Sequence, residues 1–425
     1  MATSEVIPPP PYLPSGLRHK YLIHGQALTP NRGASADIDW EPNYEKYQKR
    51  VAARASLKGL PTQVPEGWPN TLRSPLAWTS DTHSESDYVY QLTTGHKEEI
   101  WSAVRHFKEL GVHVRDINKA NFPLPTLSAD LDRLSDELHQ GKGFFVLRGL
   151  SGTSVSDEDS SLAFLGLSSH VAPQFGRQDQ QGSMIVHIVD ANGENIPKEH
   201  RQSVYTNVAQ PFHNDVFCEV LGLYTANTAA KGGNRIIASA STVYNELAAT
   251  RPDIIHTLAK GDWTFDTFGR DPAYHQRPLM YHADGKLITN FSRRILTGAP
   301  PASPRTPGIP PMSEAQAEAL DAVHFTAVKH QLSTRMEPGD VTFLNNHAVL
   351  HCRDAFEDDD DQRQRHLVRL WLRHPDKAWR VPAPLRMAWD RVYADVSDVD
   401  DEWPLRPRLD RCGISTRNNP SCGQG

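Results

Sequence analysis

The sequence QPFHNDV at residues 210–216 places His213 and Asp215 two residues apart in an apolar, strand-like setting. In an extended backbone, side chains i and i+2 project from the same face. One imidazole and one carboxylate are therefore expected to point at one spot. Because these two groups are common ligands of divalent metal ions, the stretch predicts one half of a metal site carried by β-structure.

The spacing of His213 and Asp215 does not identify a metal site by itself. Two histidines and one carboxylate on a shared face, with the opposite face left open, form the facial triad that binds Fe(II) in non-haem oxygenases. A histidine two residues before an acidic residue also occurs elsewhere in the chain, at His83/Glu85, His96/Glu98, His282/Asp284 and His374/Asp376. A second histidine from another part of the chain has to distinguish the functional pair from the incidental ones.

The candidate for this second histidine lies in the sequence EPGDVTFLNNHAVLH, residues 337–351. A Pro-Gly-Asp turn followed by an apolar strand is expected to deliver His351 at the far end of a sheet segment. His347 is the alternative. In a regular strand it shares a face with His351 but lies about 13 Å away, so only one of the two is expected to join the metal.

Two arginines follow His351 at a spacing that suits an anion-binding pocket. An Fe(II) oxygenase needs a two-electron donor, and the donor 2-oxoglutarate carries a distal carboxylate that arginine binds bidentately. Arg365 and Arg369 lie four residues apart, before and within the apolar run at residues 366–373, so both are predicted to face one cavity. The alternative is that they are cations at a rim, facing the acidic run at residues 357–361.

The composition limits the classes of function. The chain has 425 residues and a formal net charge of −6, which provides no basic field to attract nucleic acid or anionic lipid. Its four cysteines lack CxxC spacing, which favours free thiols in a reducing compartment. The N-terminus lacks the apolar core of a signal peptide, and no apolar run approaches about 18 residues. We expect a soluble, cytoplasmic protein that binds a small molecule, with no nucleic-acid or membrane partner, as a monomer or a homo-oligomer.

Three regions are predicted along the chain. Residues 1–90 are rich in proline and polar residues, with aromatic residues such as Tyr12 and Tyr21 between them, and are expected to form an extended segment that wraps a core. Residues 91–395 are expected to form a single domain. Residues 396–425 are expected to form a polar, mobile C-terminal tail.

Hydrophobic periodicity and N-capping residues predict the elements of the central domain. Helices are predicted at residues 93–110, 128–140, 156–170, 241–259 and 313–331. Strands are predicted at residues 143–149, 184–189, 220–228, 235–239, 287–291, 341–344 and 366–373. Many short strands interrupted by helices favour a mainly β architecture with α-helices: a double-stranded β-helix (jelly-roll or cupin-like) core with helical insertions packed outside.

An ordered series of motifs resembles the taurine catabolism dioxygenase (TauD/TfdA-like) family of Fe(II)/2-oxoglutarate enzymes. The resemblance covers roughly residues 143–374, which is over half of the chain. It rests on GFFVLRG at Gly143, HND at His213, AKGG at Ala230, FLNNHAVLH ending at His351 and RHLVRLWL at Arg365. Such an ordered series is far more specific than a single His-x-Asp pair.

The resemblance implies a role for each matching residue. His213, Asp215 and His351 would bind iron, with no catalytic residue beyond these metal ligands. Arg365 would bind the distal carboxylate of 2-oxoglutarate, and Arg369 would contact the substrate anion or help to hold the cosubstrate. Fe(II), 2-oxoglutarate and O2 would then oxidise an unactivated C–H bond of a small polar, anionic metabolite, by hydroxylation, desaturation or oxidative cyclisation, with succinate and CO2 as co-products.

One stretch departs from the family pattern. After the paired glycines the family has an acidic residue and then Thr or Ser, whose hydroxyl helps to bind 2-oxoglutarate, whereas this chain reads GGNR at residues 232–235. Ser239 or Ser241 is a candidate for a replacement hydroxyl. Related halogenases lack the carboxylate ligand, so the presence of Asp215 argues against halogenation.

Other side chains are candidates for lining the substrate pocket. Tyr205, Asn207 and Phe212 lie near the metal-binding stretch, and Trp371 shares a strand face with Arg369. We predict that these residues line the pocket, with packing in an aromatic core as the alternative.

Four polar residues are expected to have supporting or surface roles. Asn345 and Asn346 are expected to be turn residues or to support a metal ligand by a hydrogen bond. Arg293 and Arg294 are expected to be solvated, with a second anion site as the alternative.

Two alternatives to a 2-oxoglutarate enzyme stay open from the sequence alone. The first is a cupin-like metalloenzyme that uses the same triad without 2-oxoglutarate, such as a ring-cleaving enzyme or an isomerase. The second is a non-catalytic binding protein of the same fold, which the GGNR sequence at residues 232–235 favours and the intact set of metal ligands disfavours.

Overall fold

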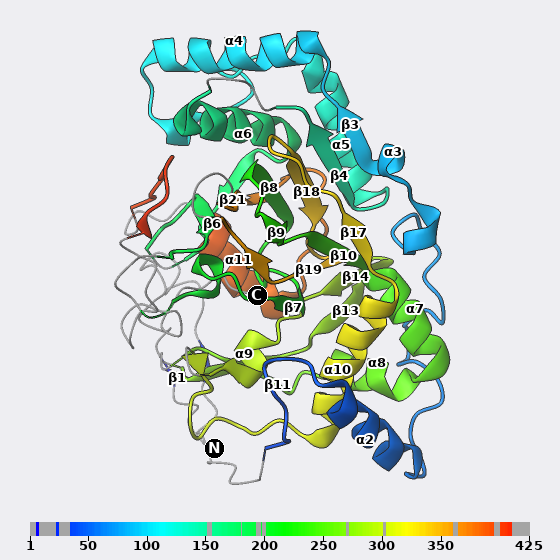
Figure 1. The fold of residues 1–425 in the computed structure, drawn as a ribbon. Coiled ribbons are helices and arrows are strands. Elements are labelled where there is room, and N and C mark those ends of the chain that lie inside the picture. The colour runs from blue at the N-terminus through cyan, green and yellow to red at the C-terminus, as the bar shows by residue number, and fades with distance from the viewer. Residues whose placement is uncertain are drawn as a thin grey trace.

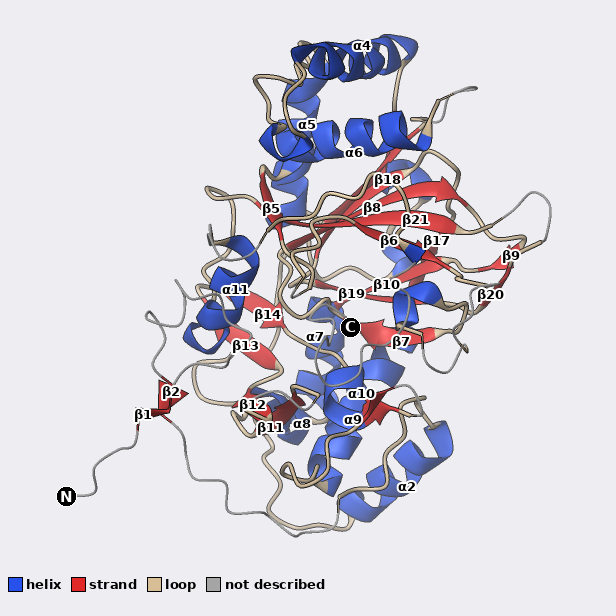
Figure 2. Cartoon of the chain, turned by 90° about the vertical axis from the view of Figure 1, so that its left-hand side faces the viewer, coloured by secondary structure: helices blue, strands red, loops and turns tan. Residues whose placement is uncertain are grey.

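The structure, a computed structural model, describes residues 6–7, 23–24, 35–150, 155–179, 181–192, 197, 201–268, 272–300, 303–359, 364–394 and 400–409. The predictions for Tyr12, Tyr21, Cys412, Cys422 and most of the tail at residues 396–425 lie outside the described residues. The described chain is built around two β-sheets, which Figure 2 shows one above the other.

The larger sheet has the strand order β3-β4-β18-β8-β21-β5, and β6 also pairs with β21. Its strands pair antiparallel except for β3 and β4. Their bounds are β3 (Val89–Gln91), β4 (Phe144–Arg148), β5 (Gln174–Gly176), β6 (Val186–Val189), β8 (Val220–Asn227), β18 (Val341–Asn345) and β21 (His366–Arg373). Strand β4 is buried along its whole length, which explains its continuous apolar sequence.

The smaller sheet has the strand order β17-β10-β19-β7, with every pair antiparallel. Its strands are β7 (Gln210–His213), β10 (Arg235–Ser239), β17 (Leu332–Thr334) and β19 (Val349–Arg353). Side chains from both sheets meet between them in one apolar cluster, which includes Phe144, Leu221 and Trp371 from the larger sheet and Ile237 and Val349 from the smaller one. Two sheets packed face to face over a shared core confirm the predicted jelly-roll architecture.

Helices cover the outer face of each sheet, as predicted. Helices α4 (Thr94–Leu110), α5 (Leu127–His139) and α6 (Asp157–Val171) pack on the larger sheet and lie at the top of Figure 1. Helices α7 (Ala240–Thr250), α8 (Pro252–Ala259) and α10 (Glu314–Lys329) pack beneath the smaller sheet. Because the helices cover the outer faces, the inner faces of the two sheets are the faces available to form a binding site.

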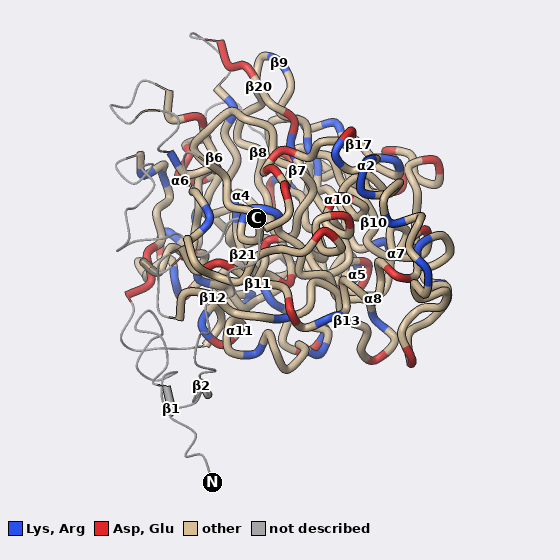
Figure 3. The backbone as a smooth tube through the Cα atoms, turned by 90° about the horizontal axis from the view of Figure 1, so that it is seen from below, with Lys and Arg blue, Asp and Glu red and all other residues tan. Residues whose placement is uncertain are grey.

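The remaining elements connect or extend this core. The helices are α2 (Tyr44–Ala55), α3 (Glu85–Tyr88), α9 (Arg294–Thr297) and α11 (Arg386–Tyr393). The paired short strands are β1 (Val6–Ile7) with β2 (Ile23–His24), β9 (Lys231–Gly232) with β20 (Phe356–Glu357), β11 (Trp263–Asp266) with β12 (Tyr274–Arg277), β13 (Met280–Ala283) with β14 (Lys286–Thr289), and β15 (Gly298–Ala299) with β16 (Ser303–Pro304). None of the helices in the described ranges combines the length and the apolar character needed to cross a membrane. Figure 3 shows basic and acidic positions interspersed along the described chain.

The predicted helix at residues 241–259 is wrong as a single element, because the structure has two helices there. Helix α7 ends at Thr250, Arg251 adopts a non-helical backbone (φ −145°, ψ 62°), and α8 begins at Pro252. Proline lacks a backbone N–H and excludes the α conformation from the residue before it, but it suits the first position of a helix. The Arg-Pro sequence therefore divides one apolar stretch into two helices.

Helix α2 lies within the segment that was expected to be extended. Asn43 caps it by accepting a hydrogen bond from the backbone N–H of Lys46. On its inner face, Arg50 Nη1 lies 3.1 Å from Asp321 Oδ2 and Arg54 Nε lies 2.7 Å from Glu318 Oε2. Both carboxylates belong to α10 and are buried. Ion pairs formed with a helix far along the chain therefore dock α2.

The prediction that Arg293 and Arg294 are solvated is wrong. Their side chains are 2% and 7% exposed, respectively. Arg293 donates to Asp321 Oδ1 (2.7 Å) and to the carbonyl of Asp39 (2.8 Å), and Arg294 donates to Ser303 Oγ (2.8 Å). A buried carboxylate on α10 compensates the charge of Arg293, which is the condition under which an arginine can be buried.

Candidate active site

Strand β7 orients the first two residues of the predicted triad. His213 is its last residue, and Asp215 follows in the adjoining turn. The Nδ1 atom of His213 donates a 2.8 Å hydrogen bond to the carbonyl of Pro211. This bond assigns the proton to Nδ1 and leaves the lone pair of Nε2 available. That nitrogen lies 3.8 Å from Asp215 Oδ1.

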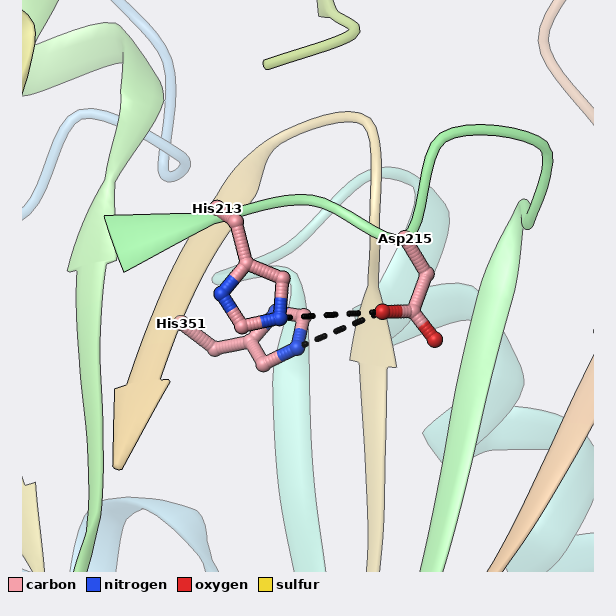
Figure 4. A group of neighbouring side chains, drawn as sticks. All are labelled: His213, Asp215 and His351. Carbon is pink, nitrogen blue, oxygen red and sulfur yellow. Dashed lines mark ion pairs between the residues drawn. The ribbon is translucent and has the colours of Figure 1, made fainter. Parts of the chain in front are cut away.

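Strand β19 supplies the third residue. Its register against β7 places His351 opposite His213, and the two imidazole rings lie 4.2 Å apart between centroids. The Nε2 atom of His351 lies 3.7 Å from Asp215 Oδ1. The candidate ligand atoms of all three residues lie within 4.8 Å of one another, and Figure 4 shows both imidazoles turned toward the carboxylate. The structure therefore brings the predicted triad together.

The predicted path of the chain to His351 is corrected in one respect. Residues 341–351 do not form one strand: β18 ends at Asn345, a turn follows, and His351 lies within β19. His347 lies in this turn and is buried, with its ring stacked on Trp389 at 5.2 Å and on Trp379 at 6.1 Å. It therefore belongs to an aromatic cluster and not to the triad.

The protonation states of the triad suit a metal ion. Burial lowers the pKa of His213, and burial together with repulsion from His213 lowers the pKa of His351 to about 3. Burial opposes ionisation of Asp215, but attraction to Arg369 and to the two histidines outweighs it and lowers the pKa of the carboxyl group. Neutral imidazoles and an ionised carboxylate are the forms that bind metal.

The carboxylate of Asp215 has two distinct sides. Its Oδ2 accepts a 2.6 Å hydrogen bond from Trp371 Nε1 and lies 3.1 Å from Arg369 Nη1. Its Oδ1, which faces the histidines, has no hydrogen-bond partner among the described residues. Asn346 holds the backbone of Asp215 from both sides, since its Oδ1 accepts from the N–H (3.0 Å) and its Nδ2 donates to the carbonyl (2.6 Å). Oδ1 is thus left facing the two histidines, and Asn346 lies where a residue that supports Asp215 was expected.

A cavity beside the triad contains both predicted arginines. It is lined by Ile188, Val204, Gln210, His213, Asp215, Leu221, Leu223, Arg235, His351, Cys352, Arg353, Arg365, Leu367 and Arg369. Arg365 and Arg369 are 2% and 6% exposed, respectively, so neither is a rim cation. We call this space the arginine cavity.

Arg235 and Arg353 are residues of the arginine cavity that were not predicted. They occupy directly opposed positions of β10 and β19, and Ile237 and His351 form the next opposed pair on the same face. The signal for Arg353 was its position two residues after His351 on one strand. The signal for Arg235 was its position immediately after the sequence Gly-Gly-Asn.

The structure separates the candidate substrate-lining residues from the arginine cavity. Phe212 faces the other side of β7, where it is buried in the core beneath the smaller sheet. Tyr205 lines a neighbouring cavity on the far side of Arg369. Asn207 accepts a hydrogen bond from the backbone of Phe356 through its own carbonyl. Trp371 is fully buried and holds Asp215.

Neither serine that was considered as a replacement hydroxyl reaches the arginine cavity. Ser239 is the N-cap of α7, where its Oγ accepts from the backbone N–H of Thr242 and donates to the carbonyl of Leu76. Ser241 is buried within the first turn of the same helix. Both lie outside the set of residues that line the cavity.

The sequence model of the family described as "Taurine catabolism dioxygenase TauD, TfdA family" matches residues 106–371. The chain belongs to this family. It is accordingly a non-haem Fe(II)/2-oxoglutarate-dependent dioxygenase that uses Fe(II), 2-oxoglutarate and O2. The predicted family and cofactors are thereby confirmed.

The chain is also similar to two individual proteins and to a solved structure. The chain is 33% identical to the taurine hydroxylase-like protein SAT17 of Stachybotrys chartarum over 79% of its own length and 89% of that protein. It is 27% identical to the FR-33289 synthase of Streptomyces rubellomurinus over 68% of its length and 85% of that enzyme. A structure of an asparagine oxygenase with Fe(II), 3-hydroxyasparagine and succinate shares the fold, with a TM-score of 0.51 and 16% identity over 67% of this chain and 93% of the oxygenase.

The residues present fit the cofactors of the TauD, TfdA family. Two imidazole nitrogens converge with Oδ1 of Asp215, which has no hydrogen-bond partner among the described residues, and this set of ligand atoms suits Fe(II). Buried guanidinium groups next to this point suit a dicarboxylate. When bound, the iron and its cosubstrate supply the oxidising power, and the protein supplies orientation and a site shielded from water.

Proposed function

We propose that the enzyme oxidises an unactivated C–H bond of a small polar, anionic metabolite, by hydroxylation, desaturation or oxidative cyclisation. His213, Asp215 and His351 hold the Fe(II) in this proposal. The observation that carries it is the position of the triad beside a cavity lined by four buried arginines. The oxidising centre and the anion-binding groups are therefore adjacent.

Arg365 is our candidate for the distal carboxylate of 2-oxoglutarate. Its Nε donates a 3.1 Å hydrogen bond to the carbonyl of Gly233, and its guanidinium lies 5.1 Å from the centre of the Phe356 ring. These two contacts fix the side chain, while Nη1 has no hydrogen-bond partner among the described residues. The apolar side chains of Leu223 and Leu367 on the cavity wall suit the methylene groups of the cosubstrate.

The charge of the arginine cavity supports an anionic substrate. The charges of Fe(II) and of a 2-oxoglutarate dianion cancel each other, and Asp215 is the one carboxylate among the residues that line the cavity. The four arginines therefore leave an excess of positive charge that a substrate anion neutralises. The name of the Stachybotrys relative refers to taurine, a small sulfonate, which is a substrate of this chemical type.

A larger cavity adjoins the arginine cavity and offers room for the body of the substrate. The two share Gln210 of β7, and the larger cavity has a volume of about 320 Å³. Its wall includes Trp40, Thr206 and Val208. A substrate that lies there with its anionic group toward the arginines is held beside the triad, and its orientation selects the C–H bond that reacts.

The experiment is an anaerobic titration followed by an aerobic screen. Fe(II) and 2-oxoglutarate together are expected to give a visible charge-transfer band. Succinate formation under O2 is then measured with amino acids, sulfonates, phosphonates and dicarboxylates, each beside its neutral ester or amide. We expect the amount of succinate formed to equal the amount of an anionic candidate substrate that is consumed. Turnover of the neutral forms with equal efficiency would overturn the proposed substrate class.

Matched variants test the iron ligands. His213→Ala and Asp215→Ala are expected to abolish Fe(II) binding and the band, whereas His106→Ala, at an exposed position of α4, leaves both unchanged. Retention of Fe(II) affinity in either triad variant would contradict the assignment of ligands.

A further inference from the structure

Arg235 occupies the position at which a hydroxyl residue was expected after the paired glycines. It begins β10 directly opposite Arg353 of β19, and the next opposed pair on that face contains His351. Because opposed residues in an antiparallel pair share a face, the side chains of Arg235 and Arg353 project to the same side as the iron-binding histidine. Both line the arginine cavity, with exposures of only 5% and 8%.

Arg235 is only partly satisfied by the protein. Its Nη1 donates to Thr342 Oγ1, while Nε and Nη2 have no hydrogen-bond partner among the described residues. The Nη1 atom of Arg365 likewise has no hydrogen-bond partner among the described residues. Neither guanidinium forms an ion pair with a carboxylate of the described chain. Buried charged donors without acceptors are costly, so these atoms favour a ligand that brings anionic oxygens.

Arg353 makes more hydrogen bonds to the protein than Arg235 does, although its Nε also has no hydrogen-bond partner among the described residues. Its Nη2 donates to the carbonyls of Thr206 (2.9 Å) and Val208 (2.6 Å), and its guanidinium lies 5.2 Å from the centre of the Phe356 ring. These contacts tie it to the wall of the cavity. Arg235 is therefore the stronger candidate for a ligand contact.

The electrostatics of the arginine cavity favour the binding of an anion. Burial, together with repulsion from Arg353 and Arg235, lowers the pKa of Arg365 to about 9. Burial lowers the pKa of Arg235 to about 10. Three cations are thus held close together at a cost that a bound dicarboxylate relieves.

We propose that Arg235 and Arg365 together clamp the distal carboxylate of 2-oxoglutarate. Arg235 then takes the place of the expected Thr or Ser and supplies a full charge where a hydroxyl supplies one neutral hydrogen bond. This inference rests on the proposed role of Arg365. It explains why the GGNR sequence at residues 232–235 is compatible with use of 2-oxoglutarate.

The first test is binding without turnover. Dissociation constants are measured anaerobically from the charge-transfer band of the Fe(II) protein with 2-oxoglutarate and with 2-oxopentanoate, which lacks the distal carboxylate. We expect Arg235→Met to weaken the binding of 2-oxoglutarate by about tenfold or more and to leave the dissociation constant of 2-oxopentanoate unchanged. Arg335→Met removes an exposed arginine from the chain next to β17 and is the control, with no expected effect on either ligand.

Each other outcome has a definite meaning. An unchanged affinity of Arg235→Met for 2-oxoglutarate overturns the clamp, and so does an equal loss for both ligands, which indicates a structural role. Absence of the band in the wild-type protein is a different failure, because it contradicts the proposed cosubstrate site and not Arg235 alone.

A second variant tests the clamp even if Arg235→Met does not fold. Arg365→Met removes the other half of the clamp and leaves Arg235 in place. If both arginines hold the carboxylate, this variant retains a preference of about tenfold for 2-oxoglutarate over 2-oxopentanoate. A complete loss of the preference assigns the carboxylate to Arg365 alone and overturns the proposal.

Discussion

The indole Nε1 of Trp371 donates a 2.6 Å hydrogen bond to Oδ2 of Asp215, on the side of the carboxylate that faces away from His213 and His351. The bond crosses from the larger sheet to the turn after β7 and is buried. It fixes the rotation of the carboxylate and so directs Oδ1 toward the two imidazoles. Trp371 therefore holds the carboxylate of Asp215, although its place on β21 had indicated a pocket wall.

The first prediction concerns this hydrogen bond. Trp371→Phe keeps an aromatic ring and removes the donor, so Fe(II) affinity is expected to fall by roughly 10- to 100-fold, as for other partners that orient metal ligands. Trp379→Phe is the matched control, because its buried indole donates to the carbonyl of His139 (3.0 Å), away from the triad. The measurement is an anaerobic Fe(II) titration of both variants, and equal affinities in the two would refute the role of Trp371.

The second prediction distinguishes the role of His351 in Fe(II) binding from the role of His347 in packing. His351→Gln is expected to lose Fe(II) binding. His347→Gln is expected to keep it and to lower the free energy of unfolding, because His347 stacks between Trp379 and Trp389. Metal titration and urea unfolding of both variants provide the comparison. Loss of iron from a folded His347→Gln protein would be the contrary result.

Local sequence patterns predicted most of the core. Apolar patterns identified α4, α5 and the long strands of the larger sheet, and the N-capping serines identified α6 and α10, which are buried on more than one face. Helix α2 was not predicted, because arginines on its inner face, and not an apolar face, dock it onto α10. Such pairing joins residues that are far apart in the sequence, so it leaves no periodic signal in either segment.

The candidate site likewise contains residues that local sequence spacing predicts and one that it does not. His213, Asp215, Arg365 and Arg369 follow from short spacings on one strand or turn, and the structure places them together. Arg235 joins them only through the register of β10 against β19, which a single strand sequence does not reveal. Phe212 was misplaced because neighbouring residues of a strand face opposite sides.

The third prediction concerns a buried charge beneath the smaller sheet. Asp321 receives Nη1 of Arg293 at 2.7 Å and Nη1 of Arg50 at 3.1 Å. Asp321→Ala leaves the guanidinium of Arg293 buried without its carboxylate partner and removes one of the two carboxylates that pair with Arg50, which keeps Glu314 at 2.9 Å. The variant is expected to lower the free energy of unfolding by about 3–5 kcal/mol.

The control for the buried charge is an exposed pair of the same chemistry. Arg380 binds Asp284 at 2.6 Å, but both side chains are more than half exposed, so Arg380→Ala is expected to cost less than about 1 kcal/mol. Urea unfolding of both variants measures the difference. Similar losses would show that burial does not govern these ion pairs.

The fourth prediction concerns Gly233, whose missing side chain leaves room for Arg365. A Cβ atom at Gly233 would lie 2.8 Å from Cδ and Nε of Arg365, and the backbone φ is +69°. Gly233→Ala is therefore expected to displace Arg365 and to weaken 2-oxoglutarate binding by about tenfold or more, with Fe(II) affinity retained. Gly285→Ala isolates the backbone strain, because Gly285 has φ +71° and nothing within 4 Å of its Cβ position. If both variants bind 2-oxoglutarate equally well in the anaerobic titration, the close approach of Gly233 to Arg365 does not seat the cosubstrate.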